Sequence, residues 1–282
     1  MSRPEPVHRS SEWVQREYGR EKWPAVARMV EEESRAESDP GRADLGRVLG
    51  RVARREACPD GALAPSQMTV AGSRVGVPRA VAHAAHQGFV LDVVGEACTP
   101  TTALVIELGS GWGRNLLSLW LSGGPASAEY VAAEYTEAGR RVAAQLAAMD
   151  PRLKFRSVAW DYRHPDLSML GRFDEAVVFT VHSVEQLPQL PAEAIDTIRG
   201  LADRVTCLHF EPVGWQLGET EQSGSTADYA AQHDYNRNLV ELLREQERQR
   251  RLNIELILPD VIGENPANST TLIVWRASEN GS

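Results

Sequence analysis

A short stretch of alternating glycines, preceded by a carboxylate, has the residue types that could hold a nucleotide-like ligand. The apolar run 103–106 ends at Glu107, and Gly109, Gly111 and Gly113 follow at alternate positions. Branched apolar residues in such a run predict a strand buried on both faces, and the leucines after the glycines predict a helix. A strand, a glycine turn and a helix N-terminus form a ligand cradle at the carboxyl edge of a parallel sheet.

The spacing of this turn argues against a dinucleotide fingerprint, because Arg114 occupies the third glycine position of Gly-x-Gly-x-x-Gly. The acid-Leu-Gly-x-Gly-x-Gly pattern instead resembles the first motif of class I S-adenosylmethionine-dependent methyltransferases. The resemblance implies that Glu107 lies near the methionine amino group and that the three glycines pass beneath the cofactor. Asn115 belongs to the same expected cofactor site. A glycine-rich turn that holds no ligand is the alternative.

A second acid follows at the expected distance. The run 128–133 predicts a strand that ends at Glu134, and Tyr135 comes next. In a βαβ nucleotide unit, an acid at this strand end accepts hydrogen bonds from ribose hydroxyls. We therefore expect Glu134 to bind the sugar and Tyr135 to lie against the adenine, although a surface carboxylate would have the same sequence signature.

The third predicted strand, 153–158, runs into Trp160, Asp161 and Tyr162. In the family that the chain resembles, an acid and a neighbour at this place contact the adenine. The resemblance therefore implies that Asp161 binds the exocyclic amine and that Trp160 or Tyr162 lies beside the ring.

Two later strand ends supply candidates for the substrate side. His182 and Glu185 follow the strand 173–180, and this loop faces the transferred methyl group in class I enzymes. His182 could accept a proton near neutral pH, and Glu185 could hold a cationic amine or guanidinium. A structural role for the histidine is the alternative.

Glu211 and Trp215 follow the strand 204–210. Together with Glu185 they would suit a planar cation, through paired hydrogen bonds and a cation–π contact. The alternative is that Glu211 caps a local turn and Trp215 belongs to the core.

A further polar cluster follows the segment 219–228, which is expected to be a flexible lid. His233, Tyr235 and Asn236 could grip a substrate there, although a capped helix start would have the same composition.

The remaining elements must bring these groups together. Helices are expected over 11–37, with an interruption at Pro24, and over 43–56 and 79–96. They form an N-terminal helical cap region, residues 1–88, and the cofactor-binding domain is expected at 89–282. The family resemblance covers about residue 90 to the end. It implies a Rossmann-like α/β fold with a seven-stranded, mostly parallel sheet, closed by antiparallel pairing of 251–258 and 270–276.

The composition limits the kinds of binding partner that are expected. The chain has 282 residues, a net charge of −9 and no basic tail, which disfavours a nucleic-acid substrate. Three cysteines without metal spacing predict reduced thiols, no metal site and a cytoplasmic protein. No apolar run approaches membrane-spanning length, so no membrane partner is expected. A homodimer is left open.

These observations predict an S-adenosylmethionine-dependent methyltransferase that acts on a small molecule. Glu185, Glu211 and Trp215 favour N-methylation of a cationic metabolite, with an arginine-like guanidino compound of a bacterial antibiotic pathway as the sharpest hypothesis. O-methylation with His182 as base is the nearest alternative. A cofactor-binding regulatory protein is a second, and an oxidoreductase is the weakest because of Arg114.

Overall fold

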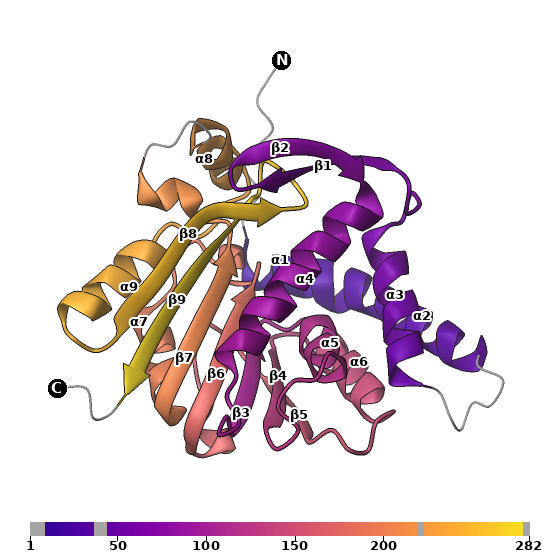
Figure 1. The fold of residues 1–282 in the computed structure, drawn as a ribbon, viewed down its shortest axis with the longest axis horizontal. Helices are drawn as coiled ribbons and strands as arrows, with labels where there is room; N and C mark the ends of the chain where they lie inside the picture. The colour runs from indigo at the N-terminus through magenta and orange to yellow at the C-terminus, as the bar shows by residue number, and fades with distance from the viewer. Residues whose placement is uncertain (1–8, 37–43, 219–222, 279–282) are drawn as a thin grey trace.

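The computed structural model describes residues 9–36, 44–218 and 223–278, which build one nine-stranded sheet with helices on both faces (Figure 1). The strand order is β2-β1-β8-β9-β7-β6-β3-β4-β5. The strands are β1 (Pro65–Val70), β2 (Ser73–Pro78), β3 (Leu104–Leu108), β4 (Glu129–Glu134), β5 (Phe155–Ala159), β6 (Phe173–Val181), β7 (Ala202–Glu211), β8 (Asn253–Gly263) and β9 (Thr270–Ser278).

The centre of the sheet is parallel. β3 lies between β4 and β6, and every residue of β3 is buried. The run of branched residues permits this, because strands covered by helices on both faces need no polar side. β9 is inserted antiparallel between β7 and β8. The Rossmann-like α/β architecture and its antiparallel closure are as expected from the sequence.

The number of strands is a correction to the expectation of seven. The two additional strands, β1 and β2, form a hairpin that pairs with the far end of β8 through Thr69 and Val70. This hairpin lies within the region expected to be a helical cap, between α3 and α4. The boundary expected at residue 88 falls inside the helix α4 (Arg79–Ala97). The two regions therefore share a helix and a sheet.

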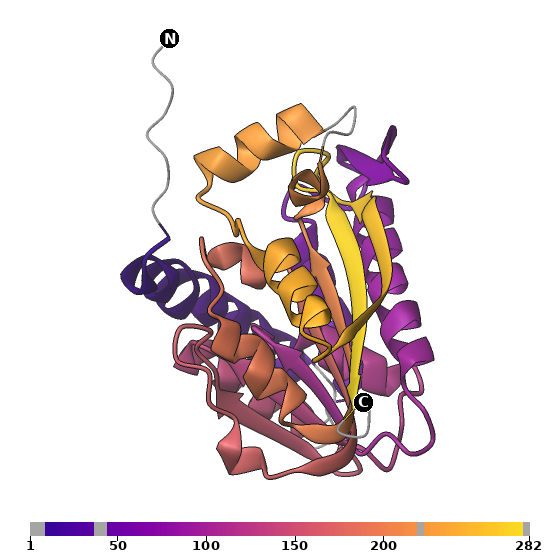
Figure 2. The same ribbon diagram turned by 90° about the vertical axis from the view of Figure 1, so that its left-hand side faces the viewer.

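The helices divide into two layers, and α4 and α9 (Leu239–Arg248) lie on opposite sides of the sheet when it is viewed along its edge (Figure 2). One layer buries apolar side chains such as Val90 and Leu117 against Val105 and Phe179. The other packs Ile195 and Leu243 on the opposite face. The first layer contains α2 (Trp23–Ala36), α3 (Leu45–Ala57), α4, α5 (Arg114–Leu121) and α6 (Glu137–Ala147); the second contains α7 (Ala192–Arg199) and α9 (Leu239–Arg248).

The first helical segment is interrupted as expected. A short turn, α1 (Ser11–Val14), continues into a π-helix, η1 (Gln15–Lys22), before α2 begins. The backbone N–H of Trp23 bonds to the carbonyl of Tyr18, five residues earlier. Pro24 has no N–H to continue an α-helical ladder. Such wide turns are found often at functional sites.

The segment before the closing strands differs from the expectation. A helix, α8 (Ser223–Gln232), occupies much of the expected lid, and residues 219–222 lie outside the described chain. The next helix, α9, begins at Leu239, after the polar cluster that was expected to grip a substrate. Asp234 has φ +52°, and this left-handed residue turns the chain between the two helices.

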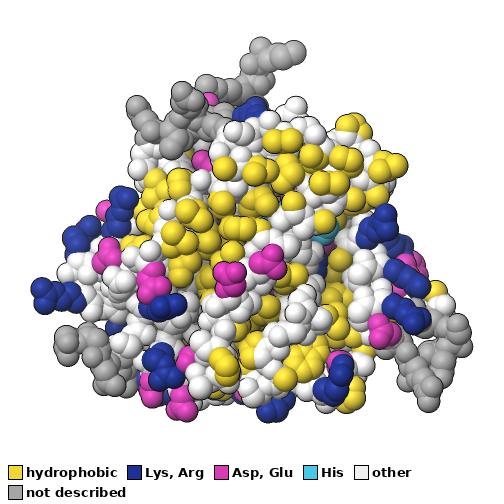
Figure 3. Space-filling model, viewed as in Figure 1, with side chains coloured by type: hydrophobic (Ala, Val, Ile, Leu, Met, Phe, Trp, Pro, Cys, Tyr) yellow, Lys and Arg dark blue, Asp and Glu magenta, His cyan; other side chains and the backbone are white. Residues whose placement is uncertain are grey.

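One face of the molecule carries few charges. Hydrophobic side chains gather there over β8, β9 and the β1–β2 hairpin (Figure 3). Val70, Val75 and Leu256 are each at least two-fifths exposed. No helix within the described residues combines the length and the apolarity needed to cross a bilayer.

His209 gives the sheet a pH-dependent stability. Its ring accepts a hydrogen bond from Trp275 Nε1 at 3.0 Å and contacts Thr180 Oγ1 at 3.1 Å. Burial lowers its pKa to about 3. Below about pH 6.5 the unfolded chain therefore binds a proton that the folded protein excludes, and the free energy of unfolding falls by up to ~1.4 kcal/mol per pH unit.

Urea unfolding between pH 7 and pH 5 measures this slope. We expect His209→Gln, which cannot titrate, to lose that part of the slope, whereas the exposed His164→Gln keeps it. An identical slope in wild type and His209→Gln would contradict the assignment.

Candidate functional site

A cavity of about 410 Å³ opens at the carboxyl ends of β3, β4, β5 and β6. It lies where βα units place ligand sites, beside the turn that follows β3. Most of the residues expected from the sequence to bind cofactor, together with the first two substrate-side candidates, line this cavity; they are Glu107, Gly109, Gly111, Asn115, Glu134, Tyr135, Trp160, Asp161, Tyr162, His182 and Glu185.

The glycine turn is held in a conformation that other residues would strain. Gly109, Gly111 and Gly113 have φ of +71°, +55° and +81°. A Cβ on Gly109 would lie 2.4 Å from Ser183 Cβ, so the loop after β6 approaches the turn closely. Gly113 does not line the cavity; a Cβ there would lie 3.0 Å from Ala143 Cβ, which makes its role the packing of α5 on α6.

Glu107 presents a buried carboxylate with spare hydrogen-bonding capacity. Its Oε1 accepts a bond of 2.7 Å from Asn115 Nδ2. Its Oε2 has no partner in the part of the chain that the structure describes. Burial raises the pKa of this carboxyl to about 8, although the Asn115 hydrogen bond and the nearby Arg114 oppose the shift. A cationic ligand group at Oε2 would restore the carboxylate's usual charge.

Glu134 binds the glycine turn directly. Its Oε2 accepts the backbone N–H of Gly111 at 3.1 Å, and its Oε1 accepts the backbone and hydroxyl of Thr136 at 2.9 and 2.6 Å. Burial raises its pKa, and these hydrogen bonds limit the rise. A carboxylate oxygen has two lone pairs, so capacity remains for ligand hydroxyls.

The end of β5 brings a carboxylate and two aromatic rings to the cavity. Asp161 is partly exposed and accepts the Arg163 backbone N–H at 2.9 Å. Trp160 is buried and its ring meets Tyr162 edge-on at 5.2 Å. The Tyr162 hydroxyl is engaged by the Leu108 carbonyl at 3.1 Å and by Ser183 Oγ at 2.8 Å. Tyr162 thus ties β3 to the loop after β6, which leaves Asp161 and Trp160 as the freer pair.

The N-terminal helices supply cavity residues that the sequence did not single out. Tyr18, Lys22 and Trp23 line the cavity, and a Cβ on Gly111 would lie 2.8 Å from the Trp23 indole. Lys22 Nζ lies 5.4 Å and 5.1 Å from the Tyr18 and Trp23 ring centroids. The indole therefore covers the glycine turn. The sequence did contain one sign of their role, which is the presence of aromatic residues beside the helix interruption predicted at Pro24.

His182 and Glu185 form a pair at the end of the cavity beside the loop after β6, which is called the substrate end below. His182 Nδ1 lies 3.0 Å from Glu185 Oε2, and its Nε2 lies 2.7 Å from Thr270 Oγ1. Burial opposes the charged ring, but Glu185, Glu211 and Glu264 together outweigh it, and the pKa of His182 is raised. His182 has φ +50°, a strained conformation that is found most often where function requires it.

Glu211, expected to act directly on a substrate, lies beneath this loop and does not line the cavity. Its Oε1 accepts the backbone N–H groups of Ser183 and Val184 at 3.0 and 3.1 Å, and its Oε2 accepts that of Glu185 at 3.2 Å. Burial raises its pKa. These three backbone N–H groups need an acceptor, and the Glu211 carboxylate supplies it. Glu211 therefore caps a turn.

The other expected substrate residues also lie outside the cavity lining: Trp215, His233, Tyr235 and Asn236. Asn236 accepts the backbone N–H groups of Asn238 and Leu239 at 3.0 and 2.8 Å and so holds the turn that leads into α9. Tyr235 is buried, with the Arg9 guanidinium 4.6 Å from its ring centroid. Helix caps and ligand grips use the same polar residues, so the sequence could not separate them.

The structure instead brings residues from α4 and the β8–β9 connection to the substrate end. His86, Glu264, Asn265 and Asn268 line the cavity there. Asn268 Oδ1 is buried without a hydrogen-bond partner among the described residues. No sequence pattern marked these residues as part of the site, because they are far from the β6 loop in the chain. Only the fold brings them beside it. No three His, Cys, Asp or Glu side chains of the described chain gather as a metal site would need.

No family model and no curated protein matches this sequence. Solved structures match in part. Magnesium protoporphyrin IX methyltransferase from Synechocystis PCC 6803, with bound SAH, is 16% identical over 71% of this chain and 87% of its own, at a TM-score of 0.49. Geranyl diphosphate methyltransferase with GPP and sinefungin is 11% identical over 70% and 78%, at 0.44. The N-terminal domain of EvdMO1 with SAH and D-fucose is 13% identical over 67% and 82%, at 0.44.

Replacing Glu211 by Gln tests its capping role. The amide would present a donor where backbone N–H groups need acceptors, and we expect the free energy of unfolding to fall by about 1–3 kcal/mol. Chemical unfolding followed by circular dichroism measures the change. The exposed Glu241→Gln is the matched control and should stay within about 0.5 kcal/mol of wild type. Equal stability of the two variants would contradict the role.

Proposed function

We propose that this protein is an S-adenosylmethionine-dependent methyltransferase that acts on a small molecule. The observation that carries the proposal is the pair of buried carboxylates on adjacent parallel strands, Glu107 and Glu134, on either side of the glycine turn. Glu107 keeps one oxygen unpartnered, and Glu134 holds the turn itself. A buried polar atom without a partner is rare in a folded protein and points to a ligand.

The residues present fit the cofactor's polar groups. The unpartnered oxygen of Glu107 suits the methionine ammonium, and the lone pairs of Glu134 suit the sugar hydroxyls. Gly109 and Gly111 both line the cavity, and Ser183 and Trp23 fill the space where their Cβ atoms would lie. Trp160 and Asp161 offer an aromatic edge and a carboxylate at the next strand end, where adenine would lie.

The bound cofactor would supply a methyl group on a sulfonium that is already activated. The protein then has to align the acceptor and exclude water. Trp23 covers the turn on one side, and the β8–β9 connection with Glu264 and Asn268 closes the substrate end. Two other classes compete with this proposal. Arg114 in the third glycine position disfavours a nicotinamide enzyme, and a regulatory protein would bind the cofactor without methyl transfer.

The acceptor class is a finer part of the proposal. The sequence predicts N-methylation of a small cationic metabolite, such as a guanidino compound of an antibiotic pathway, from Glu185, Glu211 and Trp215. Of these three residues, only Glu185 lines the cavity. Asn268 Oδ1 now adds an unpartnered acceptor beside Glu185, with Asn268 Nδ2 3.5 Å from Glu185 Oε2. A charged or N–H-rich substrate would complete both groups.

O-methylation is the second candidate, because His182 and Glu185 are in hydrogen-bond contact. A hydroxyl acceptor must lose a proton, and an imidazole held by a carboxylate is a suitable base. Both candidates use the same cavity and the same cofactor.

Calorimetry with S-adenosylhomocysteine tests the cofactor site. We expect measurable binding to wild type and at least about tenfold weaker binding to Glu107→Gln and Glu134→Gln, because each removes a charged hydrogen-bond partner. Glu129→Gln is the matched control: it lies at the opposite end of β4, outside the cavity lining, and should bind as wild type does. A folded wild-type protein that releases no heat on addition of the ligand would end the proposal.

The dependence of turnover on pH separates the acceptor classes. If His182 is the base for a hydroxyl acceptor, activity falls as pH drops through its pKa, which lies above the usual value near 6.5. His182→Gln should lower kcat by about 10²-fold or more and remove that limb of the profile. For a cationic acceptor, Glu185→Gln should chiefly raise KM. Mass spectrometry of products from arginine, simple guanidines and phenols identifies the methylated atom; bound cofactor with no transfer would favour the regulatory alternative.

A further inference from the structure

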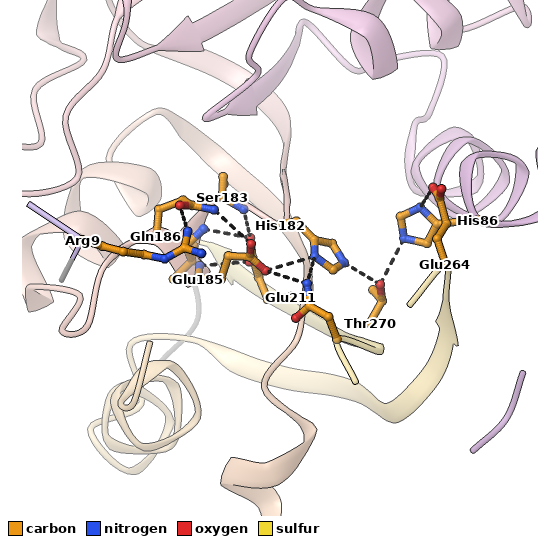
Figure 4. Close-up of polar contacts among 11 residues, drawn as sticks. Arg9, His86, His182, Ser183, Glu185, Gln186, Glu211, Glu264 and Thr270 are labelled. Atoms are coloured by element: carbon orange, nitrogen blue, oxygen red, sulfur yellow. Dashed lines mark hydrogen bonds and ion pairs between the residues drawn. The ribbon is translucent and has the colours of Figure 1, made fainter. Parts of the chain in front are cut away.

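Two parts of the cavity differ in how their polar side chains are engaged. At the substrate end the side chains contact one another, and Figure 4 shows the line from His182 through Thr270 to His86. Beside the glycine turn, two cationic side chains line the cavity and donate no hydrogen bond to any residue that the structure describes. They belong to Lys22, the last residue of η1, and Arg114, the first residue of α5. Their donors are therefore available to a ligand.

Glu56, in α3, holds both cations only loosely. Arg114 Nη1 lies 3.7 Å from Glu56 Oε2, and Lys22 Nζ lies 3.8 Å from Glu56 Oε1. Both distances exceed the range of a direct hydrogen bond, which is about 2.7–3.2 Å. Trp112 Nε1 donates to Glu56 Oε2 at 3.2 Å and fixes the carboxylate. Two cations thus face one anion, which leaves one positive charge in excess at the cavity wall.

Two aromatic rings keep the Lys22 ammonium at the cavity. Nζ lies 5.4 Å from the ring centroid of Tyr18 and 5.1 Å from that of Trp23, within the range of a cation–π contact. The wide turn of η1 brings Trp23 beside Tyr18, five residues earlier, with the ring centroids 5.4 Å apart. The π-helix therefore presents a cation to the cavity from the N-terminal helices.

A group of opposite sign stands beside these cations. Glu107 is 2% exposed, and its Oε2 has no hydrogen-bond partner among the described residues. Asn115, which directly follows Arg114, donates to Glu107 Oε1 at 2.7 Å. Burial raises the pKa of Glu107 to about 8, and the charge of Arg114 is among the influences that oppose the rise. A buried acceptor next to cations with free donors complements a ligand that carries an ammonium and a carboxylate on one carbon.

We propose that Lys22 and Arg114 bind the carboxylate of a ligand with a free α-amino acid end, whose ammonium is bound by Glu107. S-adenosylmethionine and S-adenosylhomocysteine both have such an end, so the assignment rests on the proposed function. The guanidinium matches both oxygens of a carboxylate, and the lysine adds a point charge. On binding, the two cations exchange part of their contact with Glu56 for the ligand. A nicotinamide dinucleotide offers no such pair of groups.

Calorimetry of the full chain with two ligands tests this assignment. One is S-adenosylhomocysteine, and the other is its decarboxylated analogue, which keeps the ammonium and the adenosyl group. We expect wild type to bind the analogue at least about tenfold more weakly, because charge-assisted hydrogen bonds are lost. This preference should shrink in Lys22→Gln and in Arg114→Gln and disappear in the double variant. Affinity for the analogue itself should not fall.

Lys154→Gln and Arg141→Gln are the matched controls, since each removes one positive charge from an exposed residue outside the cavity lining. Both should keep the wild-type preference for the carboxylate. Glu56→Gln removes the competing anion and should bind S-adenosylhomocysteine at least as tightly as wild type does. If the ion pairs only held α3 against η1 and α5, Glu56→Gln would weaken binding as much as Lys22→Gln does. That result would overturn the proposal.

The two ligands also separate this proposal from the assignment of function. Equal affinity of wild type for both would overturn the carboxylate site and leave the cofactor assignment standing. This comparison needs no variant, so it decides the question even if Arg114→Gln does not fold. A folded wild-type protein that binds neither ligand would overturn the proposed function, and the carboxylate site with it.

Discussion

Burial of carboxylates is the constraint on which the rest of this site depends. Glu107, Glu134, Glu185 and Glu211 are each at most 6% exposed, and they lie at or just beyond the ends of neighbouring strands. Removing a carboxylate from water is costly unless hydrogen-bond donors replace the water. Each carboxylate therefore determines the conformation of the backbone or side chain that approaches it.

The four carboxylates satisfy this constraint in different ways, and the differences separate structure from function. Glu211 uses both oxygens on backbone donors and supports a loop. Glu134 divides its capacity between the glycine turn and Thr136. Glu107 Oε2 has no hydrogen-bond partner among the described residues, and Glu185 faces a histidine. Capacity that the fold leaves unused is what a ligand can complete.

Both ends of the chain enclose this edge of the sheet. The N-terminal helices bring Trp23 onto the glycine turn, and the β8–β9 connection brings Glu264 and Asn268 to the far end of the cavity. The insertion of β9 beside β7 also places Thr270 between His86 and His182, which are 96 residues apart in the sequence. Cavity walls made from such distant segments exist only in the folded sheet.

The sequence by itself determined the α/β architecture, the central parallel strands and the positions of Glu107 and Glu134 after them. These follow from local patterns: branched apolar runs, glycines at fixed spacing and an acid at a strand end. Only the tertiary structure decided that the sheet has nine strands, that Glu211 and Asn236 accept backbone N–H groups of turns, and that His86 and Glu264 share the cavity with His182. Side chains of the same type can cap a turn or hold a ligand, and which of these they do depends on the donors that packing brings within reach.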